Sequence, residues 1–210
     1  MRVRLIAISI AITLGLTGCA EPYTLTTAEA EALMVSTPYL DEYSQPPKFN
    51  LSGDGSMGLL DSKCFEATKV ELLGKKAKPL AARGFQGNSG SVEFWRESAW
   101  KFETEQAAKD LIESLKTALK SSECTNDTGA LKSVTTEAKP VSIALVDAPE
   151  GIVYDRNVES PLSYTVRTYL LQKGNIVVKT LAWQTNDGLS EALIHLDELT
   201  QDIASKMNAK

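Results

Sequence analysis

The sequence predicts an α+β domain in which an antiparallel β-sheet has helices packed on one face. Apolar residues recur at helical spacing near the start, in the middle and at the end of the chain. Segments with the alternation of strands lie between these helices in runs, and do not alternate with them one by one. Runs of strands separated by helices are typical of antiparallel α+β folds, whereas strict strand–helix alternation would indicate a parallel sheet.

The first helix is expected over Thr27–Val35. Thr26-Thr27-Ala28-Glu29 resembles a capped helix start with an acid in the first turn. Three apolar residues then follow at helical spacing: Ala30, Leu33 and Met34. Pro38 ends the helix, because the residue before a proline avoids helical dihedrals. From Tyr39 to Lys63 the chain is rich in Pro, Gly, Ser and Asp, which indicates an irregular surface segment.

Two strands are expected next, over Phe65–Leu73 and Val92–Phe102. The second is the stronger prediction because it is aromatic and broadly alternating. Thr104 then opens a long amphipathic helix. The residues expected to be buried on this helix are Ala107, Ala108, Leu111, Ile112, Leu115, Ala118 and Leu119.

Four more strands complete the predicted sheet: Leu131–Glu137, Gly151–Val158, Ser163–Gln172 and Ile176–Trp183. The last two are joined by Lys173-Gly174-Asn175, which indicates a hairpin turn. Gly188–Met207 is expected to close the chain as a helix, because its large apolar residues recur at steps of three and four.

The first nineteen residues are typical of an exported bacterial lipoprotein precursor. Met1-Arg2-Val3-Arg4 is basic, and the apolar run Leu5–Leu16 spans about 18 Å as a helix, well short of the ~30 Å hydrocarbon core. Leu16-Thr17-Gly18-Cys19 resembles the bacterial lipobox, whose cysteine is diacylglycerated before cleavage. We therefore expect residues 1–18 to be a cleaved signal peptide, 19–25 a lipidated tether and 26–210 one extracytoplasmic domain. The alternative is an ordinary signal peptide in which Cys19 carries no lipid.

The charge balance excludes some partners. The 210 residues carry a formal charge of −5, and loss of Arg2 and Arg4 with the signal peptide brings it to −7. An acidic domain is repelled by anionic membranes and by nucleic acids. We therefore expect the N-terminal lipid to be the membrane contact, and no nucleic acid to be a partner.

The other two cysteines, Cys64 and Cys124, form an even pair in an oxidising compartment, where a disulfide can persist. Closing a loop of about 60 residues would stabilise the fold by ~4 kcal/mol. The alternative is two unrelated buried thiols. A metal site is not expected, because His195 is the only histidine and the cysteines are not closely spaced.

The sequence contains no motif that supports catalysis or the binding of a cofactor. Gly53–Gly58 matches G-x-G-x-x-G in letters, but no strand precedes it and no helix follows it, so a flexible loop explains it better. Gly87–Ser91 faintly resembles a serine-protease nucleophile loop, yet its only possible base, His195, is expected on a solvated helix face. The aromatic residues are expected to pack in the core and not to form a ligand platform: Trp95, Trp100, Tyr164, Tyr169 and Trp183.

The mature chain resembles the PknH-like extracellular sensor domain, which actinobacteria attach to receptor Ser/Thr kinases and to small lipoproteins. The resemblance covers most of residues 26–207. It rests on the opening helix with Pro38-Tyr39-Leu40, on the passage from Trp100 to Ala108, on Lys173–Val178 with the closing helix, and on Cys64 and Cys124 at the positions of a family disulfide. Better-known members have a second disulfide, for which this chain has no cysteines. The resemblance implies ligand sensing outside the membrane and no catalysis.

We therefore expect a lipid-anchored binding or sensor module on the extracytoplasmic face of the cell membrane. It would recognise an envelope or extracellular ligand, or a protein partner, without catalytic activity. The alternative is a lipid or glycolipid carrier with a large apolar cavity. An envelope hydrolase is a third class, and it would require convergent titratable groups in a cleft.

Overall fold

The structure is a computed structural model that describes residues 23–34, 57, 59, 65–85, 92–121, 126–127, 132–136, 138–141, 143, 147–159, 163–185 and 191–210. The expected signal peptide, Cys19, Cys64 and Cys124 lie outside these residues, as do Gly87–Ser91 and most of Gly53–Gly58. Each helix in the described ranges is too short or too polar to cross a bilayer.

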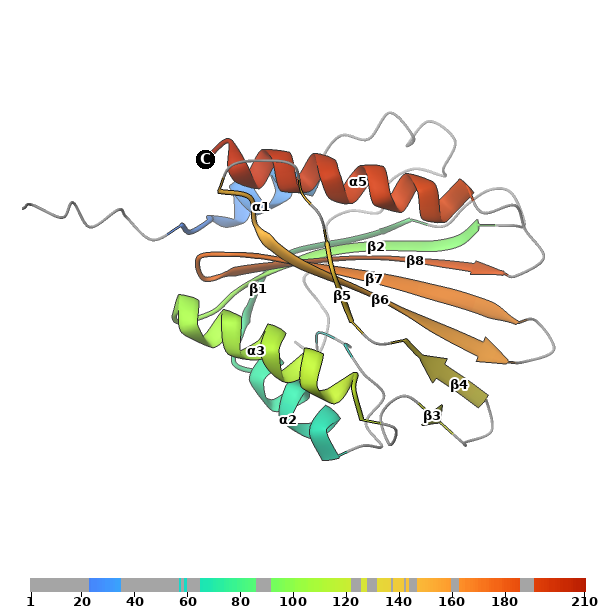
Figure 1. The fold of residues 1–210 in the computed structure, drawn as a ribbon. Coiled ribbons are helices and arrows are strands. Elements are labelled where there is room, and N and C mark those ends of the chain that lie inside the picture. Colours follow the sequence, from blue (N-terminus) through green and yellow to red (C-terminus); the bar gives the residue numbers. More distant parts are fainter. Residues whose placement is uncertain are drawn as a thin grey trace, which may run out of the picture.

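The centre of the fold is an antiparallel sheet, eight-stranded in the described part of the chain, with the order β1-β2-β8-β7-β6-β4-β3 and with β5 paired to β6 (Figure 1). The strands are β1 Lys78–Phe85, β2 Val92–Lys101, β3 Asn126–Asp127, β4 Lys132–Thr135, β5 Lys139–Pro140, β6 Glu150–Glu159, β7 Tyr164–Lys173 and β8 Ile176–Thr185. The antiparallel prediction is confirmed, and the four long C-terminal strand predictions fall on β4, β6, β7 and β8.

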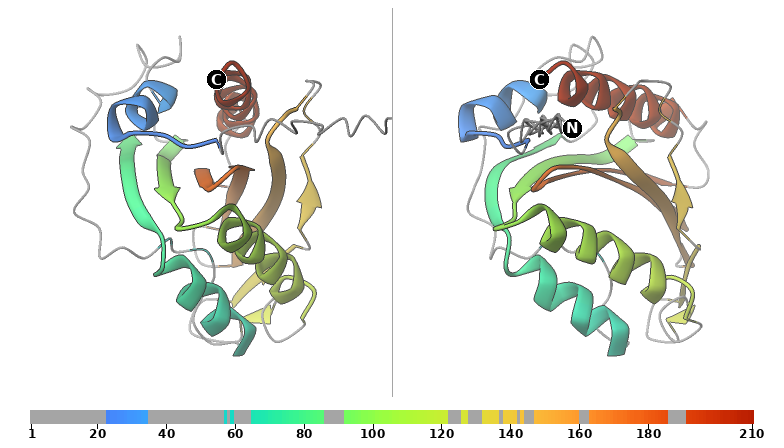
Figure 2. Two further views of the ribbon diagram at one scale, coloured as in Figure 1. Left: turned by 90° about the vertical axis from the view of Figure 1, so that its left-hand side faces the viewer. Right: turned by 60° about the vertical axis from the view of Figure 1, so that its left-hand side comes forward.

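Helices cover both faces of the sheet, so the expectation of one covered face was wrong. Figures 1 and 2 show α1 (Thr27–Met34) and α5 (Glu191–Asn208) on one face, here named the α5 face. They show α2 (Phe65–Gly74) and α3 (Glu105–Ala118) on the other, the α3 face. The physical reason is that β7 and β8 are apolar at both parities, so each face must be shielded from water.

Two apolar clusters follow from this layering. Successive residues of one strand join different clusters: Leu171 packs on the α5 face and Leu170 on the α3 face. On β8, Val178 and Val177 divide in the same way. This is the two-residue period of a strand whose side chains point alternately to opposite faces.

The predicted strand at Phe65–Leu73 is wrong, because these residues form α2. The segment combines good helix formers such as Ala, Lys, Glu and Leu, and it packs along α3. Val70 is buried there, whereas Leu72 stays 56% exposed. This irregular apolar pattern matches neither the 3.6-residue period of a helix nor the two-residue period of a strand. Packing against α3 therefore determines that the segment is helical.

The other helix predictions are confirmed within one to three residues. α3 begins as expected after Thr104, whose Oγ1 accepts a hydrogen bond from the Ala107 amide at 3.1 Å. The predicted buried residues of α3 are buried, except that Ala107 is half-buried. Three strands were not predicted: β1, β3 and β5. β3 and β5 have two residues each and carry no periodic signal.

The hairpin between β7 and β8 is confirmed, with Lys173 and Ile176 as the last paired residues. Gly174 has φ +53°, a conformation that favours glycine. A Cβ at this position would lie 2.4 Å from the Tyr23 carbonyl oxygen. The turn is therefore in close contact with the residues that precede α1. We name this end of the sheet the turn end and the opposite end the far end.

A buried ion pair ties α1 to the sheet. Arg83 of β1 and Glu97 of β2 are register partners, and their side chains meet at 3.2 Å. Arg83 also donates a hydrogen bond to the carbonyl oxygen of Met34, the last residue of α1. Burial raises the pKa of Glu97 to about 7, although the charge of Arg83 opposes this shift.

The variant Arg83→Met should lower the free energy of unfolding by about 3 kcal/mol at about pH 8, because it leaves an ionised carboxylate buried without its partner. The double variant Arg83→Met/Glu97→Met should recover at least half of that loss. Urea unfolding of the four proteins in this cycle measures both values. Lys75→Met, which breaks an exposed pair with Glu71, should cost no more than ~0.5 kcal/mol. A double variant as unstable as Arg83→Met would contradict this assignment.

Candidate functional site

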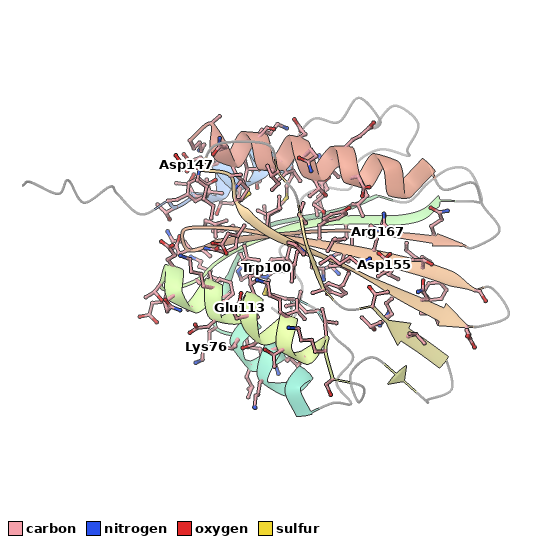
Figure 3. All side chains as sticks on the ribbon, in the orientation of Figure 1. Lys76, Trp100, Glu113, Asp147, Asp155 and Arg167 are labelled. Atoms are coloured by element: carbon pink, nitrogen blue, oxygen red, sulfur yellow. The ribbon has the colours of Figure 1, made fainter. Side chains whose placement is uncertain are left out.

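The structure separates most of the aromatic residues noted in the sequence. Trp100 packs in the cluster on the α3 face (Figure 3), and Tyr169 belongs to the cluster on the α5 face. Tyr164 and Trp183 are brought together edge to face on neighbouring strands, with ring centroids 4.8 Å apart. Trp95 lies within β2. The expectation of core packing holds for Trp100 and Tyr169, whereas Tyr164 and Trp183 are only half-buried.

The strand register places three cationic residues close together on the α3 face. Three successive rows cross β2, β8, β7 and β6: Ser98, Lys179, Leu170 and Ile152; then Arg96, Leu181, Thr168 and Tyr154; then Phe94, Trp183, Val166 and Arg156. These rows hold three cations and no acidic residue. We name them the cationic rows. They run from the middle of the sheet toward its far end.

Lys179 is the most buried of the three cations, with 4% of its surface exposed. Its ammonium donates a hydrogen bond to the carbonyl oxygen of Met57. The pKa of Lys179 falls to about 7, first because burial disfavours the charged form and then because Arg96 and Arg156 repel it. The protein thus holds this amine in surroundings that oppose its charge.

Two further hydrogen-bond donors on these rows are buried. Ser98, the register partner of Lys179, is 1% exposed, and its Oγ has no hydrogen-bond partner in the described structure. The indole Nε1 of Trp183 is also buried, and the described residues provide no acceptor for it. Unmatched buried donors are rare in native proteins and call for an explanation.

The other two cations of the rows are more accessible than Lys179, because Arg96 is exposed and Arg156 is half-buried. They lie on opposite sides of the rows, on β2 and β6, and Leu181 of β8 and Thr168 of β7 lie between these strands. Arginine, lysine, hydroxyl and indole groups all donate hydrogen bonds, so the rows bring several donors to the α3 face.

The α5 face has a different charged group at the far end. Arg167 of β7 donates to both carboxylate oxygens of Asp155, at 2.8 and 3.0 Å, and lies 3.7 Å from Asp197 of α5 (Figure 3). Tyr169 donates its hydroxyl to the same Asp197. These carboxylates raise the pKa of Arg167. This network gives Arg167 two carboxylate partners and joins α5 to the sheet.

Sequence reasoning missed the cationic rows. Their members come from four strands and share a face only through the register, which composition does not give. One local signal was present, because Lys179 interrupts the apolar run Ile176–Leu181. His195 belongs to α5, on the opposite face of the sheet. Among the residues whose placement is described, no group of three His, Cys, Asp or Glu side chains could hold a metal ion.

Comparison with known proteins gives a likeness of fold. The sequence matches no known family profile and no curated protein. Among solved structures, the chain is similar to the extracellular domain of PknH from Mycobacterium tuberculosis, with a TM-score of 0.53 and 17% sequence identity. The alignment covers 90% of this chain and 94% of that one. The chain therefore shares the fold of that domain over nearly its whole length.

The charge of Lys179 should destabilise the protein below pH 7. Its folded-state pKa of about 7 lies below the ordinary 10.5, so the unfolded chain binds this proton more tightly. The loss of stability caused by this charge is therefore greatest below about pH 7, and it decreases as the pH rises toward 10. Lys179→Met should therefore raise the free energy of unfolding by on the order of 2 kcal/mol at about pH 6, and the gain should shrink at about pH 9.

Urea unfolding at the two pH values measures this difference. Lys120→Met, at an exposed position after α3, is the matched control and should change stability little at either pH. A Lys179→Met variant that is equally destabilised at both pH values would show that the lysine charge is compensated within the fold.

Proposed function

We propose that the chain is a lipid-anchored extracytoplasmic binding or sensor module without catalytic activity. The lipobox-like Leu16–Cys19 supports the anchor. The likeness to an extracellular domain supports the location and the sensing role. The domain would recognise an envelope or extracellular ligand, or a protein partner, and would pass its signal to a separate protein.

The observation that carries this proposal is the position of Tyr23, four residues after Cys19. The Asn175 amide donates to the Tyr23 carbonyl oxygen at 3.4 Å, and the ammonium of Lys173 lies 5.1 Å from the centre of the Tyr23 ring. Four residues reach at most ~14 Å. A lipid on Cys19 would therefore hold the turn end of the sheet next to the bilayer.

Attachment at the turn end would orient the domain relative to the bilayer. From Ile176 to Trp183, β8 extends by ~23 Å at about 3.3 Å per residue. The cationic rows lie along this strand and end at the far end, so they would face away from the bilayer that holds the anchor. A recognition surface at that end would be open to ligands in the envelope.

The absence of catalysis is part of the proposal. The charged contacts described on the α5 face pair arginine or lysine with carboxylates, and several of them link structural elements, as Arg83 does with Glu97 and Lys210 with Glu29. The single histidine belongs to α5, across the sheet from the cationic rows. The cationic rows bring together side-chain hydrogen-bond donors, which suit ligand binding.

The variant Cys19→Ser should lose the acyl chains and, with them, membrane anchoring. The expected result is that wild type partitions into the detergent phase in Triton X-114 extraction and incorporates labelled palmitate, whereas Cys19→Ser incorporates none. Two or more acyl chains give stable anchoring. Cys64→Ser serves as the matched control and should be labelled like wild type. Equal labelling of Cys19→Ser would rule out the anchor.

We also propose a disulfide between Cys64 and Cys124. Cys64 directly precedes α2, and Cys124 follows α3 by six residues. The Phe65 end of α2 and the Ala118 end of α3 lie at the same end of the packed pair, as Figure 2 shows, which supports the bridge.

Thiol titration of the unreduced, denatured protein tests this bridge. Lipidated wild type should give no free thiol and should give two after reduction. The Cys64→Ser variant should release one free thiol, from Cys124, without reduction. Two free thiols in unreduced wild type would exclude the disulfide and leave the proposed anchor untouched.

A further inference from the structure

We infer that Arg83 and Glu97 form a pH-dependent latch, which holds the C-terminal end of α1 on the sheet while Glu97 is ionised and releases it when Glu97 takes up a proton. The latch consists of the Arg83 guanidinium, the Glu97 carboxylate and the carbonyl oxygen of Met34, the last residue of α1. This inference goes beyond the proposed binding function, and it requires neither the lipid anchor nor a ligand.

One nitrogen of Arg83, Nη2, makes both contacts of the latch. It donates a hydrogen bond to the carbonyl oxygen of Met34 and another to Oε2 of Glu97, at 3.2 Å. Arg83 belongs to β1, the strand on which α1 mainly packs, and it is 5% exposed, so both contacts lie away from water. A change in the charge of Glu97 therefore acts directly on the group that holds the end of α1.

The Glu97 carboxylate is incompletely hydrogen-bonded, although it is almost fully buried. Glu97 is 1% exposed, and its Oε1 has no hydrogen-bond partner among the described residues. The hydroxyl of Thr180, the register partner of Glu97 on β8, pairs instead with the hydroxyl of Thr200 of α5 at 2.9 Å. A buried carboxylate with few donors is poorly stabilised in its ionised form, which favours uptake of a proton.

The charged groups around Glu97 leave Arg83 as the main charge that keeps it ionised. Asp202 and Lys206 of α5 act on Glu97 in opposite directions and pair with each other at 2.7 Å. The neighbour on β8, Thr180, carries no charge. α1 carries two acids: Glu31, which is half-buried, and Glu29, which pairs with Lys210.

The sign of the pH effect follows from the contribution of Arg83. Burial raises the pKa of Glu97 to about 7, and the charge of Arg83 opposes this shift. If Arg83 moves away while β2 stays paired with β1 and β8, Glu97 remains buried but loses the charge that lowers its pKa. The released form then binds the proton more tightly than the latched form, so acid shifts the equilibrium toward release.

Release of α1 in acid would be a local event and not unfolding. The ordinary pKa of this carboxyl is 4.5, so the unfolded chain binds the proton less tightly, and Glu97 stabilises the folded domain as the pH falls from about 7 to 4.5. The other end of α1 is held independently of Glu97, by the burial of Leu25 and Ala30. Acid would therefore expose Leu33 and Met34, which are 3% and 1% exposed in the latched form.

Hydrogen–deuterium exchange of the full lipidated chain in nonionic detergent tests the latch at about pH 6 and about pH 8, with labelling times scaled to the intrinsic amide rate. The charge of a contacting arginine changes the proton affinity of a carboxylate about tenfold or more. We therefore expect α1 to exchange about fivefold faster in acid, relative to α3. Glu97→Gln imitates the protonated acid, so its α1 should exchange at the fast rate at both pH values.

Asp155→Asn is the matched control, because Asp155 also pairs with an arginine on the α5 face but lies toward the far end of the sheet. This variant should keep the wild-type pH response of α1. Equal protection of α1 in wild type at both pH values overturns the inference, as does a wild-type pH response in Glu97→Gln. Faster exchange of α1 and α3 together in acid would show that the whole fold loosens, and it would also overturn the latch. The outcome is independent of the Cys19→Ser test, because exchange of α1 requires no bilayer.

Discussion

Burial of both faces of β7 and β8 is the constraint on which the rest of the structure depends. At Leu170 and Leu171, and again at Val177 and Val178, neighbouring residues point to opposite faces and are almost fully shielded from water. A sheet with such a centre is stable only between two helical layers, which α5 and α3 supply. Every polar side chain near the centre must then find its partner within the protein or in a ligand, because water cannot reach it.

The two faces meet this requirement differently. On the α5 face, Arg83 and Glu97 compensate each other, and Arg167 does so with Asp155 and Asp197. On the α3 face, the ammonium of Lys179 donates a hydrogen bond to the carbonyl oxygen of Met57.

The sequence predicts the parts of this fold whose signal is local. α3 and α5 have long apolar stripes, and the β7–β8 turn has its glycine, so these elements could be predicted from their own residues. α2 could not, because its short, irregular apolar pattern is resolved only by its packing on α3. The second helical layer was missed although β8 is apolar at consecutive positions. The cationic rows depend on the pairing of β2 with β8, between strands some 75 residues apart in the chain, and no local pattern reports such a pairing.

That pairing also governs the order in which the fold can be assembled. A chain emerging amino end first, from a ribosome or an export channel, exposes β2 long before its partner β8, while α3 and the hairpins can form from nearby residues. Until β8 arrives, one edge of β2 is an open template for pairing with another chain. Arg96 and Glu97, one on each face of β2, place charges along that edge during the delay. Charges on such an edge disfavour its pairing with another chain before β8 is available.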